Sequence, residues 1–172
     1  RPNGGIVIAG QFLGSFGIGG QSYTTQPPSN VQDFVDGYVV ALDSSLGVSW
    51  SHDFRYSGAS TQPTSIAQGA DGKTWIVGST SRPTADSYDI DAFVAVFDAM
   101  GLPVWNRNFG DLTSSQQANG VVTESDGSAV IVGEFEQALL VPGGSVLVSS
   151  GSTDGFLIRV SPTYQVSNVL AI

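Results

Sequence analysis

The sequence of 172 residues predicts an all-β fold made of a repeated unit of antiparallel strands. Two sequence blocks carry this prediction, because each occurs three times along the chain. The first block, clearest as DGKTWIVG, occupies 3–10, 71–78 and 126–133, and the second, clearest as DAFVAVFD, occupies 36–43, 91–98 and 154–161. A repeat reports how a fold buries its apolar faces, so both blocks indicate architecture and say little about chemistry.

The spacing of the repeat divides the chain into one array of three units. Asp36 recurs as Asp91 and Trp50 recurs as Trp105, in both cases 55 positions later. The predicted units are 1–55, 56–110 and 111–172. We therefore expect one domain over 1–172 and not several unrelated ones.

Four strands are predicted in the middle unit, at about 63–69, 73–79, 91–97 and 103–109. Each is a short apolar run rich in Val, Ile, Phe and Trp and bounded by Gly or Asp-Gly, which is typical of strands. Asp71-Gly72 supplies the positive φ of a tight hairpin between the first two. The second and third runs are apolar on both faces, which predicts a sheet covered on both sides. Trp105 and Phe109 lie four apart in the last strand, so they share a face and are expected to fill the gap to the next sheet.

Sheets that are covered on both faces and repeat along a chain predict a β-propeller, in which each blade lies between two neighbours. We expect about three four-stranded antiparallel blades, of which the first is incomplete because its first strand is missing. The third unit has Tyr164 and the residues after it where a Gly and a Trp are expected. Fewer than three whole blades cannot close a ring, so the chain is predicted to be part of a larger or oligomeric propeller, completed by further blades of the same polypeptide or by copies of itself.

The repeat resembles the bacterial seven-bladed β-propeller repeat of the SBBP type. The residues that carry the resemblance are Asp71-Gly72 to Gly78, Asp91-Ala92-Phe93-Val94 and Asp98, Gly101, Trp105 and Phe109. The resemblance implies a bacterial protein that is secreted or exposed at the cell surface. A narrower stretch, from Ala41 through Asp43 and Gly47 to Trp50, is similar to the tryptophan-docking motif of quinoprotein-type propellers. It argues for docked blades, and no cofactor is predicted because the acids of a quinone site are not evident.

Composition excludes several classes of partner. The formal net charge is −9 and only 12% of residues are charged, without a Lys/Arg cluster, so neither nucleic acid nor an anionic membrane surface is an expected partner. No apolar run approaches the roughly 20 residues that cross a bilayer, so we predict no membrane insertion. Cysteine is absent, which leaves no disulfide and no thiolate metal site. The Ser/Thr/Gly-rich, Lys-poor composition favours an extracellular location.

The sequence offers no catalytic constellation, and we predict that the protein is not an enzyme. His52 is the only histidine and lies between Ser51 and Asp53. Neighbouring residues of a strand point to opposite faces, so these three cannot converge as a triad, and His52 is expected to be a surface residue of an edge strand. Three nearby acids, Asp86, Asp89 and Asp91, leave calcium as an alternative. However, Asp91 recurs in all three units, which favours hydrogen bonds to backbone amides at a strand corner, so no metal is predicted.

A variable segment between the second and third strands of each unit is the expected site of function. These segments, at 11–35, 80–90 and 134–153, are expected to gather with the connections between units on one loop face. The candidate ligand-binding residues on this face are Tyr23, Phe34, Arg55, Tyr56, Arg82 and Tyr88. An aromatic ring beside a polar group can bind a sugar or a peptide, although single surface Tyr and Arg residues are also ordinary.

The predicted function is a non-catalytic, secreted or cell-surface propeller scaffold whose loop face binds a macromolecule, either a protein or a glycan. A carbohydrate-binding propeller is one alternative, but the three variable segments share neither length nor an evident motif, so equivalent sugar pockets are not expected. Another alternative is part of a propeller enzyme whose active residues lie outside this chain.

Overall fold

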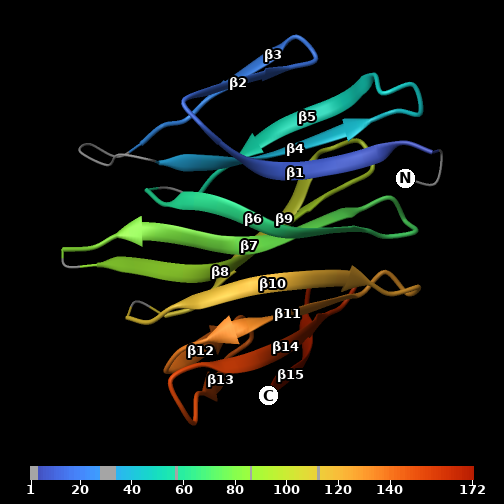
Figure 1. Cartoon of the computed structure of the whole chain (residues 1–172). Helices are drawn as coiled ribbons and strands as arrows, with labels where there is room; N and C mark the ends of the chain where they lie inside the picture. The colour runs from blue at the N-terminus through green and yellow to red at the C-terminus, as the bar shows by residue number, and fades with distance from the viewer. Residues whose placement is uncertain (1–3, 28–33, 57, 86, 112) are drawn as a thin grey trace.

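The computed structural model describes residues 4–27, 34–56, 58–85, 87–111 and 113–172 (Figure 1). Every regular element in these residues is a β-strand, which confirms the all-β prediction. The strands form three main antiparallel sheets and two separate two-stranded hairpins. Figure 1 shows the three sheets layered one over the next, in the order of the chain.

Each main sheet corresponds to one predicted unit. Sheet 1 has the strand order β1 (Ile6–Leu13), β4 (Val35–Leu42) and β5 (Val48–Phe54). Sheet 2 has the order β6 (Ser60–Gln68), β7 (Thr74–Pro83), β8 (Tyr88–Phe97) and β9 (Pro103–Phe109). Sheet 3 has the order β10 (Gln116–Thr123), β11 (Ala129–Phe135), β14 (Asp154–Val160) and β15 (Val166–Ala171). The four strands of the middle unit and the missing first strand of sheet 1 are thus as predicted.

The Asp-Gly turns form for the reason that the sequence indicates. Asp71 accepts the backbone N–H of Lys73 through Oδ1 at 3.0 Å, and Gly72 has a φ of +81°. The same geometry recurs one unit later, where Gly127 has a φ of +85°. The carboxylate satisfies a backbone donor while glycine adopts the left-handed conformation, so β6 turns directly into β7 and β10 into β11.

Sheet 2 is apolar on both faces because it is covered on both. Along β7, Ile76 packs with Val39 and Phe93 in the core between sheets 1 and 2. Its neighbours Trp75 and Val77 point the other way, into the larger core between sheets 2 and 3. Alternation along one strand thus supplies side chains to both cores.

The repeated tryptophans of the frame join each sheet to the next. Trp50 of β5 packs on the β8–β9 turn, where a Cβ on Gly101 would lie 2.4 Å from the Trp50 ring. Trp105 of β9 stacks on Tyr164 in the β14–β15 turn, with the ring centroids 5.4 Å apart. Tyr164 and Gly101 hold the same repeat position, and both have positive φ. The Tyr164 ring covers Trp105, whereas Gly101, which has no side chain, leaves space for the ring of Trp50. These contacts show that the tryptophan of the last strand packs against the following sheet in both gaps.

The variable segments of the first and third units both form hairpins, a shared structure that their lengths and sequences do not indicate. The hairpins are β2 (Ser15–Ile18) with β3 (Gln21–Thr24), and β12 (Ala138–Val141) with β13 (Ser145–Val148). Both are closed by one backbone hydrogen bond of 2.8 Å, in which Thr25 donates to the Gly14 carbonyl and Ser149 donates to the Gln137 carbonyl. Gly14 and Gln137 both have positive φ. Among the described residues of the middle unit, β7 leads to β8 without a further two-stranded hairpin such as β2–β3 or β12–β13 between them.

The two hairpins hold equivalent places on their sheets. The β2–β3 hairpin covers the face of sheet 1 that points away from sheet 2, where Phe16 stacks on Tyr38 at 4.6 Å between ring centroids. The β12–β13 hairpin contacts β9 and β15, and its Leu139 and Val141 are buried in the core between sheets 2 and 3. Each hairpin therefore covers the corresponding side of its own sheet, which in the third unit is the side that faces sheet 2.

Candidate functional site

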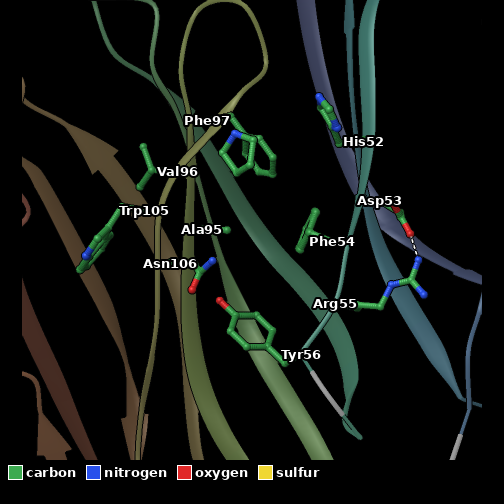
Figure 2. A pocket seen from close by; sticks show the side chains of 11 residues that line it. His52, Asp53, Phe54, Arg55, Tyr56, Ala95, Val96, Phe97, Trp105 and Asn106 are labelled. Atoms are coloured by element: carbon green, nitrogen blue, oxygen red, sulfur yellow. Dashed lines mark hydrogen bonds and ion pairs between the residues drawn. The ribbon is translucent and has the colours of Figure 1, made fainter.

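An open cleft with a volume of about 250 Å³ lies between the outer strands of sheets 1 and 2. We call it the β5–β9 cleft. Its wall on sheet 1 is the end of β5 and the residues just after it, and its wall on sheet 2 comes from β8 and β9. Figure 2 shows His52, Phe54 and Tyr56 on one side and Phe97 and Asn106 on the other.

The cleft is open because the middle unit lacks the hairpin that its neighbours have. In the equivalent gap between sheets 2 and 3, Leu139 is fully buried beside Phe109, which is 0% exposed. Phe54 holds the position of Phe109 one unit earlier, yet its ring is only half-buried. The frame is the same in both gaps, so the exposure of Phe54 follows from the missing hairpin.

Aromatic rings form most of the cleft wall. The His52 ring lies nearly parallel to that of Phe97, with the centroids 6.0 Å apart and an interplanar angle of 19°. Phe54 packs on the same Phe97 ring at 5.9 Å. Tyr56 closes the far end, with its ring 5.5 Å from Phe93. The wall is therefore suited to flat or branched apolar groups.

The polar groups of the cleft are mostly engaged already. The Tyr56 hydroxyl donates to the carbonyl of Val94 at 3.2 Å, and burial raises the pKa of this phenol, so it stays neutral. Arg55 forms an ion pair with Asp53 at the β5 side of the cleft (Figure 2). Asn106 is exposed on the opposite wall. This arrangement offers an apolar interior with few free hydrogen-bonding groups.

Arg55 also lies beside a buried acid. Its Nε is 4.0 Å from Oδ2 of Asp36, a side chain that is 0% exposed. Neither oxygen of that carboxylate has a hydrogen bond of ordinary geometry among the described residues, although the backbone N–H of Gln26 approaches it. Burial raises the pKa of Asp36 and the Arg55 guanidinium opposes the rise. Arg55 is thus held between two carboxylates, and its place at the edge of the cleft is fixed by them.

The residues around His52 do not form a catalytic group. The Ser51 hydroxyl shares a hydrogen bond of 2.8 Å with the Tyr23 hydroxyl, on the face of β5 opposite to the cleft. Asp53 pairs with Arg55. The three side chains therefore diverge, as strand alternation predicts. His52 is on an edge strand as expected, but its ring lines the cleft against Phe97 and is not a plain surface group.

The structure brings together only two of the six predicted binding residues, Arg55 and Tyr56, which both line the cleft. Phe34 is 3% exposed, so its assignment to a binding surface is wrong. Tyr23 lies on the β2–β3 hairpin, and its hydroxyl also donates to the carbonyl of Ser51. Phe34 is buried because nearness to a loop in the sequence does not determine exposure, and Tyr23 lies apart from the β5–β9 cleft.

The last two predicted residues lie apart from the cleft, where β7 and β8 turn. Arg82 pairs with the buried Asp89, with Nη1 and Oδ2 3.3 Å apart, and Tyr88 is 61% exposed. The sequence analysis missed Phe97 and Asn106, which it placed in the frame. A usable signal was the short middle segment: Gly78 to Asp91 spans 13 positions, against 26 and 21 in the other units.

The acids considered for calcium contact other groups. Asp89 pairs with Arg82, and Asp86 lies outside the described residues. Burial, helped by the neighbouring charge of Asp89, raises the pKa of Asp91 to about 6. In the part of the chain that the structure describes, no three His, Cys, Asp or Glu side chains gather as a metal site would require. The expected corner role holds in the third unit, where Asp154 accepts the backbone N–H of Ser150 at 2.7 Å.

Comparison with known proteins adds no family: no family model matches the chain, and no curated protein matches it. Across the described residues no helix is both long and apolar enough to cross a membrane. The functional argument therefore rests on the geometry of the cleft and on the internal repeat.

Proposed function

We propose that this chain is a non-catalytic β-propeller scaffold of the SBBP repeat type that binds a macromolecule at the β5–β9 cleft. The observation that carries the proposal is the half-buried Phe54 in a gap whose counterpart, around Phe109, is filled by the protein itself. Aromatic surface left open at this gap lowers the stability of the frame there, and a partner that covers the surface offsets this. The Lys-poor composition, rich in Ser, Thr and Gly, supports a secreted or cell-surface location.

The exposed ends of the stack support the propeller part of the proposal. Ile6 and Ile8 are 45% and 40% exposed on the outer side of sheet 1, and Val132 is 40% exposed on the outer side of sheet 3. Val132 holds the repeat position of Val77, which is 0% exposed because sheet 3 covers it. Further blades of the same polypeptide, or copies of the chain, would cover both ends in the same way.

Light scattering coupled to size exclusion tests the propeller part. We expect a defined oligomer, or a monomer that becomes stable when flanking blades are added to the polypeptide. A stable monomer whose stability does not respond to added blades would contradict the propeller.

The binding part is tested by comparing the wild-type protein with Asn106→Arg on peptide and glycan arrays. Asn106 is exposed on the cleft wall, so the longer side chain can enter the cleft without disturbing the core. We expect the variant to lose the signals that the wild-type protein gives. Retention of every signal would place binding elsewhere on the molecule.

A further inference from the structure

Resting on the proposed binding function, we propose that the ligand of the β5–β9 cleft is a two-stranded β-hairpin with one apolar face, presented by a protein partner. The protein carries a template for this ligand, because its own β12–β13 hairpin fills the equivalent gap one unit later. The proposal thus follows from comparing one gap that is filled with one that is open.

The filled gap shows which contacts the hairpin makes. Leu139 and Val141 of β12 are 0% and 4% exposed and belong to one core with Phe109. Leu147 of β13 packs against the same core, as does Val166 of β15. The hairpin therefore buries apolar side chains from both of its strands between the two sheets.

The open gap presents the same positions of the repeat. Phe54 corresponds to Phe109, and Pro103 corresponds to Val166. Both Phe54 and Pro103 line the cleft. Since the frame repeats, a hairpin inserted between β5 and β9 would meet an apolar wall in the same places as β12–β13 does.

The tip of the template hairpin shows how a partner would be oriented. Pro142 and Gly143, at the turn, lie beside Trp105 and Val166. Gly143 and Gly144 both have positive φ, which gives a tight turn that fits between the sheets. A partner hairpin is expected to present its turn toward Trp50 and Pro103 in the same manner.

The free polar groups of the cleft are too few for a sugar. Saccharide recognition requires several polar groups that converge on the ligand hydroxyls. Here the Tyr56 hydroxyl is occupied by Val94, and Arg55 is occupied by Asp53. Asn106, the His52 ring and the outer side of the Arg55 guanidinium are the polar groups left at the wall, which suits a few backbone or side-chain groups of a peptide.

The test uses the template itself as the probe. The Ser149 amide and the Gln137 carbonyl are already hydrogen-bonded at 2.8 Å, so residues 137–149 can be made as a head-to-tail cyclic peptide. Calorimetric titration of this peptide into the wild-type chain should give saturable binding with one site. A cyclic peptide with Leu139→Asp should not bind, because it would bury a charge against the aromatic wall.

Two protein variants locate the binding site. Asn106→Arg fills the cleft and should weaken binding at least tenfold, about 1.4 kcal/mol. Arg107→Gln is the matched control, because Arg107 is next along β9 but lies on the opposite side, over the Trp105 ring at 6.0 Å. Binding to Arg107→Gln should equal that of the wild type, and unfolding curves of both variants check that each is folded.

The outcomes separate this inference from the proposed function. Absence of saturable peptide binding at concentrations of about 1 mM, or binding that Asn106→Arg leaves unchanged, would overturn the inference. A glycan that binds the wild type but not Asn106→Arg, with no binding of the peptide, would also overturn it while leaving the cleft as a binding site. If the wild-type chain bound neither the peptide nor a glycan at the cleft, the proposed function would be overturned as well.

Discussion

Truncating Phe54 and Phe109 in parallel measures how open the cleft is. The two residues hold the same repeat position, on β5 and β9 respectively. Phe109 is 0% exposed under the β12–β13 hairpin, so Phe109→Ala should cost about 3–5 kcal/mol, the usual range for a fully buried phenylalanine. Phe54 packs on Phe93 and Phe97 but leaves part of its ring to solvent, so Phe54→Ala should cost about half as much, roughly 2 kcal/mol.

Urea unfolding followed by tryptophan fluorescence gives both values, provided that the dependence of the free energy on urea is the same in each variant. The expected difference of about 2 kcal/mol is well above the error of such measurements. If the two costs agreed within about 0.5 kcal/mol, Phe54 would be as enclosed as Phe109, and the reasoning from the missing hairpin would be refuted.

Two other predictions concern the variable segment of the middle unit and the titration of Asp91. Replacing residues 79–90 by 134–153 should place a hairpin in the β5–β9 cleft. Calorimetry should then show no binding of the cyclic peptide, and Phe54→Ala should cost as much stability as Phe109→Ala. An unchanged affinity for the peptide would contradict this prediction. Asp91 has a pKa raised from 3.8 to about 6, so the stability that it contributes is complete below about pH 4 and is lost as the pH rises through 6. Asp91→Asn should therefore raise the free energy of unfolding at pH 8 by about 1–2 kcal/mol, after allowance for partial exposure. The free energy of unfolding of the variant should also depend less on pH between pH 4 and 8. A pH profile equal to that of the wild type would count against a raised pKa of Asp91.

The sheets could be predicted from the sequence because several local signals agree. Strand periodicity, the turn at Asp71-Gly72 and apolar residues on both faces each require the same covered sheet. The contacts of Trp50 and Trp105 with the next sheet are also predictable, because each tryptophan lies on the same strand face as the phenylalanine four positions later. Tyr164 was noted as a departure from the pattern, but its stacking on Trp105 depends on an aromatic ring at a positive-φ position, which no strand pattern predicts.

The hairpins could not be predicted in the same way. Strands of four residues such as Ser15–Ile18 are too short for alternation to be read, and the glycines around them are typical of loops. An isolated two-stranded hairpin has little stability of its own and forms here because Phe16 packs on Tyr38. That contact joins residues 22 positions apart, so it belongs to tertiary structure.

The candidate site was only half predictable, because it arises from something that the middle unit lacks. Arg55 and Tyr56 follow a predicted strand, which marked them as candidates. Phe97 is part of the repeated frame and is 3% exposed, so its burial hardly differs from that of its counterpart Val160, which is 0% exposed. Only a comparison of the three variable segments in space shows that Phe97 faces an open cleft, since a residue pattern describes what is present in each unit and not what covers it.

The arrangement separates stability from recognition within one repeat. The frame residues fix the distance between neighbouring sheets, through contacts such as that of Trp50 with the turn at Gly101. The variable segment then decides whether the gap is filled, and shortening it opens a cleft without changing the frame. The aromatic surface exposed at Phe54 lowers the stability of the free protein, and the hairpin that we propose as the ligand would recover that free energy. Binding and stability at this site are therefore coupled, so a ligand present at 100 times its Kd would raise the free energy of unfolding by about 2.7 kcal/mol.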